Sequence, residues 1–295
     1  MCGWTAPTAF TDSSSQRHAV LNGIAKRYTA LGRLPRSPSM LLRAAQITLL
    51  AGIFALAPSR SSAETSPREV VEKAEELRRI DNSIQTVRMT LVSKSGSERT
   101  REFELKVRRD DDAVRSHTRF LSPADVAGTA MVIVDHPDQI DEQLLYVPAL
   151  RRVTRISGKA RSGSFLGSDF SFEDLELSDA DSATHKMLSE DPDNWLVETI
   201  PGDGSAYGRV IATIRRSDHL PVKIEYFNKK GKAWKTLEVK DTLTTGGATY
   251  PKTSLMKDLI RGTTTRLEVL EYRVDVSRDE LPDALFSQTA LERGE

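Results

Sequence analysis

Apolar side chains recur at every second position through most of the chain after residue 84, and this period of two constrains the fold most strongly. In residues 101–109, for example, Phe103, Leu105 and Val107 alternate with charged side chains. Such alternation is typical of an antiparallel strand with one buried and one solvated face. Turn-forming residues separate about eleven segments of this kind, at residues 84–94, 101–109, 113–121, 130–135, 142–147, 194–200, 206–215, 220–228, 232–241, 249–256 and 263–276. Because no helical pattern lies between them, the predicted fold is mainly β: a large curved antiparallel sheet, or half-open β-barrel.

The last of these segments changes phase. Leu267 and Val269 share one parity, whereas Leu270, Tyr272 and Val274 share the other. A change of phase within a strand predicts a β-bulge, which inserts one residue and bends the sheet. A sheet of this size can curl around an apolar space or fold into a filled sandwich, and the alternation alone does not separate these two possibilities.

One amphipathic helix precedes the strands. Residues 66–69, Ser-Pro-Arg-Glu, form a capping box with proline at the first helical position. Apolar residues then follow at helical spacing, namely Val70, Val71, Ala74, Leu77 and Ile80. This pattern predicts a helix over residues 67–80. Two shorter helical turns are expected in the acidic region, near residues 172–177 and 184–189.

The first 63 residues differ from the rest of the chain. Residues 1–39 contain Ser, Thr and Pro, almost no acids and no periodicity, and we interpret them as a non-structural upstream extension. Residues 40–63 have the pattern of a secretory signal peptide that is cleaved after Ala63. The alternative is a membrane anchor or a targeting extension, although the apolar run is shorter than the about 20 residues of a membrane span. We expect residues 64–295 to form a single domain, soluble in the periplasm after cleavage.

Charge and composition exclude several classes of function. Residues 1–63 hold 7 of the 42 Lys and Arg residues and 1 of the 42 Asp and Glu residues, so the remaining chain has 35 basic and 41 acidic residues and a net charge of about −6. An acidic chain argues against nucleic acid as a partner. Cys2 is the only cysteine and the five histidines lack metal-ligand spacing. We therefore expect no metal, no cofactor and no enzymatic activity.

Residues 144–175 read LLYVPALRRVTRISGKARSGSFLGSDFSFEDL. A short apolar strand ends at Pro148, which cannot donate to a sheet ladder. A basic strand follows, then an aromatic patch spaced by Gly and Ser, and finally a group of acids. This order is typical of a basic strand and a flap at the mouth of an apolar interior, and it does not match a catalytic motif.

The segments LYVPALRRVTRIS and SFLGSDFSFEDLE resemble the signature of the LolA-like family of outer-membrane lipoprotein-sorting proteins, which includes LolA, LolB and LppX types. Members usually read LYxPxLRRVRRI and SFMGSDFSYEDL, so that Leu166 stands for Met and Phe172 for Tyr. The resemblance extends over most of the chain after about residue 64. It implies a curved sheet with short lid helices over a hydrophobic cavity, and a periplasmic carrier that binds acyl chains in outer-membrane lipoprotein sorting or lipid export.

Taken with this resemblance, three groups of residues are candidates for the site. The expected lipid-binding residues of the cavity or its mouth are Phe103, Leu105, Met131, Ile133, Leu145, Val147, Phe165, Leu166 and Phe170. Some of these residues could equally be ordinary core. The basic residues Arg151, Arg152 and Arg155 are expected to contact head groups or a partner, or to form a solvated face. The acids Asp169, Glu173 and Asp174 are expected to pair with those arginines and hold a lid closed.

The expected partners are lipid or lipoprotein acyl chains, together with an inner-membrane transporter or an outer-membrane acceptor. The protein is expected to be a monomer. An alternative function is a periplasmic sensor or adaptor that binds an inner-membrane transporter of RND or MMPL type, or a regulator. A filled sandwich with a structural role is the third possibility.

Overall fold

The computed structural model describes residues 65–78, 82–136, 141–176 and 182–293. These residues all belong to one compact unit, which spans Arg60–Glu295. The predicted upstream extension and signal peptide lie outside the described residues.

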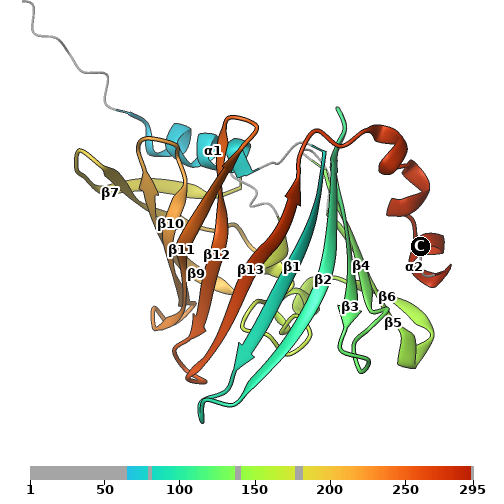
Figure 1. Ribbon diagram of the computed structural model, residues 1–295. Helices are drawn as coiled ribbons and strands as arrows, with labels where there is room; N and C mark the ends of the chain where they lie inside the picture. Colours follow the sequence, from blue (N-terminus) through green and yellow to red (C-terminus); the bar gives the residue numbers. More distant parts are fainter. Residues whose placement is uncertain (1–64, 79–81, 137–140, 177–181, 294–295) are drawn as a thin grey trace, which may run out of the picture. The chain divides into compact units, whose positions relative to one another are not determined.

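Thirteen antiparallel strands form a single sheet in the described part of the chain. They are β1 (Ser83–Val92), β2 (Glu98–Arg109), β3 (Val114–Ser122), β4 (Ala130–Asp135), β5 (Glu142–Val147), β6 (Arg152–Ile156), β7 (Thr184–Glu190), β8 (Asn194–Ile200), β9 (Tyr207–Arg215), β10 (Pro221–Asn228), β11 (Ala233–Thr245), β12 (Ala248–Asp258) and β13 (Thr263–Arg273). Their order is β6-β5-β4-β3-β2-β1-β13-β12-β11-β10-β9-β8-β7. Strands β6 and β7 are the two edges, so the curved sheet remains open (Figure 1). The predicted fold class is confirmed.

The strand count exceeds the predicted eleven because β6 and β7 extend the sheet at its edges. The basic segment after Pro148 forms β6, as expected. Strand β7 occupies the region where a helical turn was predicted near residues 184–189, and that prediction is wrong. In β7, Met187 is half-buried and packs toward the core, whereas Lys186 and Leu188 are directed outward. Pairing with β8 determines this strand, since its mostly polar sequence carries little apolar alternation.

The N-terminal helix α1 (Pro67–Arg78) packs near the β7 edge of the sheet. Val70, Val71 and Ala74 pack on Trp195 and Val197 of β8, in one buried apolar cluster. The helix begins at the predicted proline, and its predicted end at residue 80 lies outside the described residues. None of the helices in the described ranges combines the length and the apolar character that crossing a membrane requires.

The bend predicted in the last strand is confirmed. Between β1 and β13 the register shifts, because Thr86 lies opposite Glu271 whereas Val87 lies opposite Val269. Leu270 is therefore the inserted residue, and its side chain is exposed. The bulge lies where the two halves of the sheet meet, so it contributes to the curvature.

The sheet has an inner face, which carries Val87, Met89, Phe103, Met256 and Leu267. Residues that pair across neighbouring antiparallel strands share a face, so this set extends along the whole sheet. Helix α1 packs on the inner face of β8 and β9. The short 3-10 helices η2 (Gly158–Ser162) and η3 (Glu173–Leu175) belong to the segment between β6 and β7.

The C-terminal segment covers the outer face of β4, β5 and β6. It comprises η4 (Arg278–Glu280), η5 (Asp283–Phe286) and α2 (Gln288–Arg293). Its buried side chains Leu281, Phe286 and Leu291 pack on Val132 of β4. Arg108 is buried beneath this segment, donates to the Leu281 carbonyl at 2.8 Å and stacks on the Phe286 ring. This part of the sheet is therefore buried on both faces.

Candidate functional site

An apolar cavity of about 380 Å³ lies on the inner face of the sheet. Its lining comes from strands on both sides of the β1–β13 junction, from α1 and from the segment after β6. Apolar members of the lining include Val87, Met89, Phe103, Leu105, Leu267 and Val269. The volume falls in the lower part of the range of about 300–1,000 Å³ that is typical of small-molecule sites. The cavity therefore suits a small apolar ligand or part of a larger one.

We call residues 157–176 the flap. The flap folds into a tight hairpin, in which the backbone N–H of Phe165 donates to the Phe170 carbonyl at 2.7 Å. The turn places Leu166 and Gly167 in the left-handed region, at φ 49° and 78°. Glycine adopts this conformation readily, whereas leucine does so only when other contacts hold it. Arg101 of β2 provides one such contact by donating to the Leu166 carbonyl.

Three buried phenylalanines of the flap, Phe165, Phe170 and Phe172, pack against the inner face of the sheet. The Phe165 ring lies 5.9 Å from the Phe120 ring and 5.7 Å from the Phe172 ring, measured between centroids. Phe170 belongs to the same cluster, which includes Phe103 of β2. These rings fill the inner face over β2, β3 and β4, and the cavity is the space that they leave beside them. The flap is therefore a lid with an apolar inner side.

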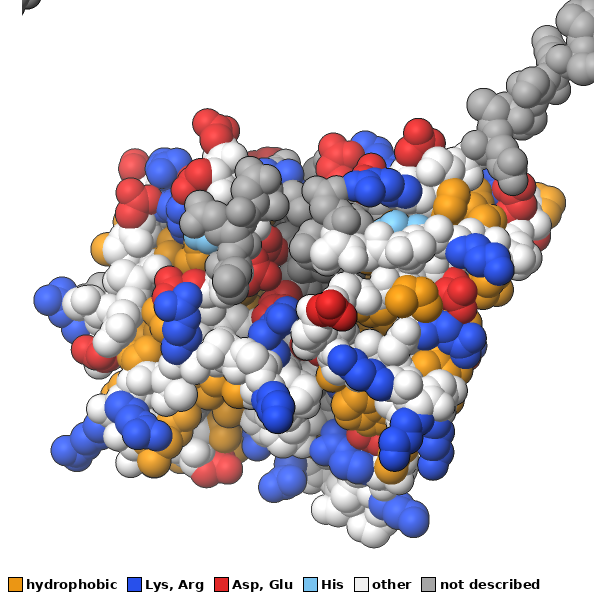
Figure 2. Space-filling model, turned by 180° about the vertical axis from the view of Figure 1, so that it is seen from behind, with side chains coloured by type: hydrophobic (Ala, Val, Ile, Leu, Met, Phe, Trp, Pro, Cys, Tyr) orange, Lys and Arg blue, Asp and Glu red, His pale blue; other side chains and the backbone are white. Residues whose placement is uncertain are grey.

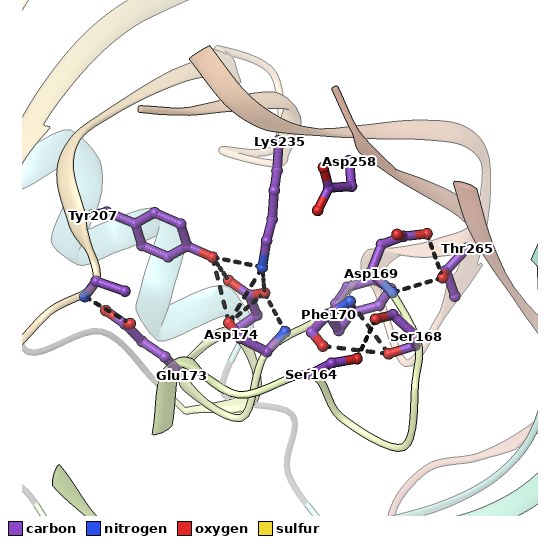
Figure 3. Close-up of polar contacts among 12 residues, drawn as sticks. Ser164, Ser168, Asp169, Phe170, Glu173, Asp174, Tyr207, Lys235, Asp258 and Thr265 are labelled. Atoms are coloured by element: carbon purple, nitrogen blue, oxygen red, sulfur yellow. Dashed lines mark hydrogen bonds and ion pairs between the residues drawn. The ribbon is translucent and has the colours of Figure 1, made fainter. Parts of the chain in front are cut away.

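Asp169 fixes the tip of the flap to the other half of the sheet (Figure 3). Its carboxylate accepts hydrogen bonds from Thr265 at 2.8 Å, from Thr263 at 2.5 Å and from the Arg261 guanidinium at 2.8 Å. The Asp169 backbone N–H donates to the Thr265 hydroxyl at 2.9 Å. The carboxylate is 4% exposed, and these donors replace the water that burial removes.

Asp174 makes a second set of contacts, with β9 and β11 (Figure 3). The Lys235 ammonium lies 2.9 Å from its carboxylate, and the Tyr207 hydroxyl donates to it at 2.6 Å. Ser171 donates through both its backbone N–H and its hydroxyl. Burial and the nearby Asp174 charge raise the pKa of Tyr207 far above its usual range, so Tyr207 remains a protonated donor.

Two glutamates complete the attachment of the flap. Glu173 accepts from the Ser205 hydroxyl and from the Ala206 backbone N–H, at the loop before β9. Glu176 accepts from Arg161 within the flap and from Gln143 of β5. The flap is thus held by polar contacts on β5, β9, β11 and β13, which lie on both sides of the cavity.

The structure brings most predicted cavity residues together. Five of them line the cavity: Phe103, Leu105, Ile133, Phe165 and Phe170. Three others pack in the apolar cluster beside it: Met131, Leu145 and Leu166. Val147 is half-buried at the end of β5, opposite Arg152.

The sequence predicted that the flap acids pair with Arg151, Arg152 and Arg155, and these partners are wrong. Asp169, Glu173 and Asp174 do hold the flap, but they bind residues of β9, β11 and β13 and the adjoining loops. Arg155 points to the outer face, because Ile156 beside it points inward, and it lies 3.4 Å from Glu142. Arg151 and Arg152 are exposed at the β5–β6 turn.

Several residues of this site were not predicted, among them four that hold the flap: Arg101, Tyr207, Lys235 and Thr265. For Lys235 the sequence does carry a signal. It shares strand parity with Leu237, so the alternation places a lysine on the apolar face, where it requires a buried partner. The other three are polar or aromatic residues whose role depends on the position of the flap. Across the described ranges, no group of three or more His, Cys, Asp and Glu residues could hold a metal ion.

Comparisons with known proteins support the fold. A family model described as "-like: Uncharacterized protein" matches residues 112–293. No curated protein matches the chain. A putative outer membrane lipoprotein-sorting protein domain from Vibrio parahaemolyticus is 29% identical with a TM-score of 0.70, over 77% of this chain and 100% of that chain.

Two further solved structures are similar. A DUF1329 family protein from Desulfovibrio piger is 25% identical with a TM-score of 0.71, over 76% of this chain and 97% of that chain. A LolA superfamily protein from Nitrosomonas europaea is 17% identical with a TM-score of 0.62, over 77% and 100% of the two chains, and it shows the fold alone. The chain belongs to the family whose model matches residues 112–293, and it has the fold of the solved lipoprotein-sorting domain and of the LolA superfamily protein.

Proposed function

We propose that this protein is a periplasmic carrier that holds an acyl chain of a lipid or lipoprotein in the cavity under the flap. One observation supports the proposal above the others. The cavity is apolar, and its lid combines an apolar inner side, formed by Phe165 and Phe170, with polar contacts that fasten it to the sheet. A filled sandwich has no such cavity.

The energetics favour a hydrocarbon ligand. Each CH₂ group that moves from water into an apolar site contributes about 0.8 kcal/mol. The aliphatic side chains Val87, Leu105 and Leu267 offer flexible contacts of this kind. If the flap moves, the surface under it, which includes Met131 and Leu145, becomes available to a longer chain. The exposed Arg151 and Arg152 remain proposed contacts for head groups or a partner.

The remaining parts of the proposal concern location and chemistry. The periplasmic location rests on the leader pattern of residues 40–63 and on the family resemblance. The protein acts by binding and release without catalysis, since the buried carboxylates Asp169 and Asp174 are engaged in holding the flap. Release of the ligand then requires these contacts to break.

Native mass spectrometry of the protein purified from the periplasm tests the carrier function. We expect a bound lipid, and after its removal we expect uptake of a fluorescent fatty acid. Leu105→Trp fills the cavity and should weaken uptake at least about tenfold, whereas Leu188→Trp on the exposed edge strand β7 should not. Absence of uptake by the delipidated protein would contradict the proposal. Stoichiometric capture of an inner-membrane transporter regardless of lipid content would favour the adaptor function instead.

A further inference from the structure

We propose that one end of the sheet is a docking surface for an anionic lipid membrane. Three neighbouring hairpin turns form this surface, which we call the tip surface: residues 93–97 between β1 and β2, 229–232 between β10 and β11, and 259–262 between β12 and β13. The first and the last lie side by side at the lower end of the sheet in Figure 1.

The contacts between these turns place them together. Strand β13 lies between β1 and β12, and Val92 at the end of β1 pairs with Thr264 at the start of β13. The Leu259 backbone N–H donates to the Trp234 carbonyl at 2.8 Å, which joins the β12–β13 turn to the start of β11. The side chain of Lys94 in the β1–β2 turn lies beside Gly262.

Two large apolar side chains project from the tip surface. Leu259 and Ile260 are consecutive residues in the β12–β13 turn, and their side chains are 50% and 53% exposed. The turn is well defined, because Asp258 accepts from the backbone N–H groups of Ile260 and Arg261 at 2.9 and 2.7 Å. An exposed apolar pair on a fixed turn is typical of an interaction site.

Basic side chains surround this apolar pair. The exposed basic residues of the three turns and their ends are Lys94, Arg99, Lys229, Lys230, Lys232 and Arg261. Among the acids there, Glu98 is exposed, whereas Asp258 is buried and paired with Arg261. Lys and Arg side chains predominate along the lower part of the molecule in Figure 2, and most Asp and Glu side chains lie above them. This end is basic although the chain after residue 63 is acidic.

A fourth turn, between β5 and β6, lies at the same end of the sheet as the tip surface. The β5–β6 turn lies at the same strand ends as the β1–β2 turn, since the strands between them alternate in direction. Leu150 in that turn is 60% exposed, and Arg151 and Arg152 follow it directly. The pairing of an exposed leucine or isoleucine with adjacent cations therefore occurs twice at this end.

A lipid surface fits these features better than a protein partner does. A stable protein interface buries about 800 Å² on each partner, with packed apolar residues at its centre. The tip surface offers narrow turns with few apolar side chains and long, flexible lysines. Such turns can insert apolar side chains at the level of the lipid head groups while the cations contact phosphates. The docking surface is independent of the ligand in the cavity.

A vesicle flotation assay with the protein purified from the periplasm tests the proposal. We expect binding to vesicles of phosphatidylethanolamine and phosphatidylglycerol, weaker binding to phosphatidylcholine vesicles, and a decrease in binding as salt rises. L259S/I260S should weaken binding to the anionic vesicles at least about tenfold. The control Leu188→Ser removes a similarly exposed apolar side chain at the β7 edge and should leave binding unchanged.

A second pair of variants tests the electrostatic part. K229Q/K230Q should weaken binding to anionic vesicles by roughly fivefold for each lysine. The control K73Q/K240Q removes two exposed lysines elsewhere and should have no effect. Circular dichroism and fatty-acid uptake in solution should be unchanged in all four variants, which separates docking from the carrier function.

Three results would overturn the docking surface. They are equal binding of L259S/I260S and wild type, equal binding to neutral and anionic vesicles, and no binding of the wild type to protein-free vesicles. Binding only to native inner-membrane vesicles, lost when these are treated with protease, would assign the tip surface to a protein partner.

Discussion

The Lys235 ammonium lies 2.9 Å from the Asp174 carboxylate, and the two side chains are only 4% and 2% exposed. This ion pair joins the flap to β11, and the Tyr207 hydroxyl contacts both partners. Breaking a buried pair by removing one member usually costs about 3–5 kcal/mol, since the other charge remains buried without compensation. The pair is therefore one of the contacts that hold the flap closed.

Replacement of Lys235 by Met should lower the free energy of unfolding by about 3 kcal/mol or more, because Asp174 loses its cation. Urea denaturation measures this change, and limited proteolysis should show cleavage within the flap. The double variant K235M/D174N should recover a large part of the loss, since it removes both charges. A single variant as stable as the wild type would contradict this role.

Asp169→Asn should loosen the tip of the flap while preserving its shape. The amide has one acceptor oxygen for the three donors that now reach Asp169, so we expect a loss of about 1–3 kcal/mol. Stopped-flow measurements should show faster uptake and release of a fluorescent fatty acid. Asp203→Asn, in an exposed loop, is the matched control. Unchanged exchange rates in D169N would show that the tip contact does not limit opening.

The stability of the protein should fall in acid because of His117. Burial, followed by the nearby charges of Arg119 and Lys106, lowers the pKa of His117 from 6.5 to about 4. Between these two values the unfolded chain binds a proton that the folded chain does not, so stability is present above pH 6.5 and is lost as pH falls toward 4. Protonation of His117 in the unfolded chain therefore lowers the free energy of unfolding by roughly 2 kcal/mol between pH 7 and pH 5.

Urea denaturation at pH 7 and pH 5 measures the His117 effect. His117→Met removes the titrating group, so its loss of stability over this range should be smaller than that of the wild type by about that amount. His219→Met is a control for a histidine in a turn between strands. Equal pH dependence of H117M and wild type would contradict the prediction.

The C-terminal segment should contribute to stability and leave ligand uptake unchanged. Phe286 packs on the outer face of the sheet, opposite to the cavity, so Phe286→Ala should destabilise the protein by about 3–5 kcal/mol. Gln288→Ala in the same segment is exposed and should have little effect. Below its melting temperature, F286A should bind fatty acid with unchanged affinity. A reduced affinity would link the outer face to the site.

The period of two was sufficient to predict the sheet, its bulge and most of its strands, because side-chain parity is a local property. The same argument placed Phe103 and Leu105 on the cavity side. It failed for β7, whose polar residues acquire their strand conformation from pairing with β8. Local patterns also gave no indication that Leu281, Phe286 and Leu291 cover the outer face, since that contact joins distant parts of the chain.

The sequence predicted many of the residues that form the site, but it did not predict which residues they contact. Phe165 and Phe170 were expected at the cavity, and they line it. The partners of Asp169 and Asp174 could not be derived, because residues about 60 and 90 positions later in the sequence supply them. Lys235 was the one partner that parity could have identified.

The flap is covalently continuous with both edge strands, because residues 157–183 join the end of β6 to the start of β7. Its closure is therefore an intramolecular step, and its rate does not depend on protein concentration. The distance that the flap can travel is limited by its own contour length, at most about 3.6 Å for each residue released. In the proposed carrier cycle, the same lid thus returns to the same sheet after each loading and emptying.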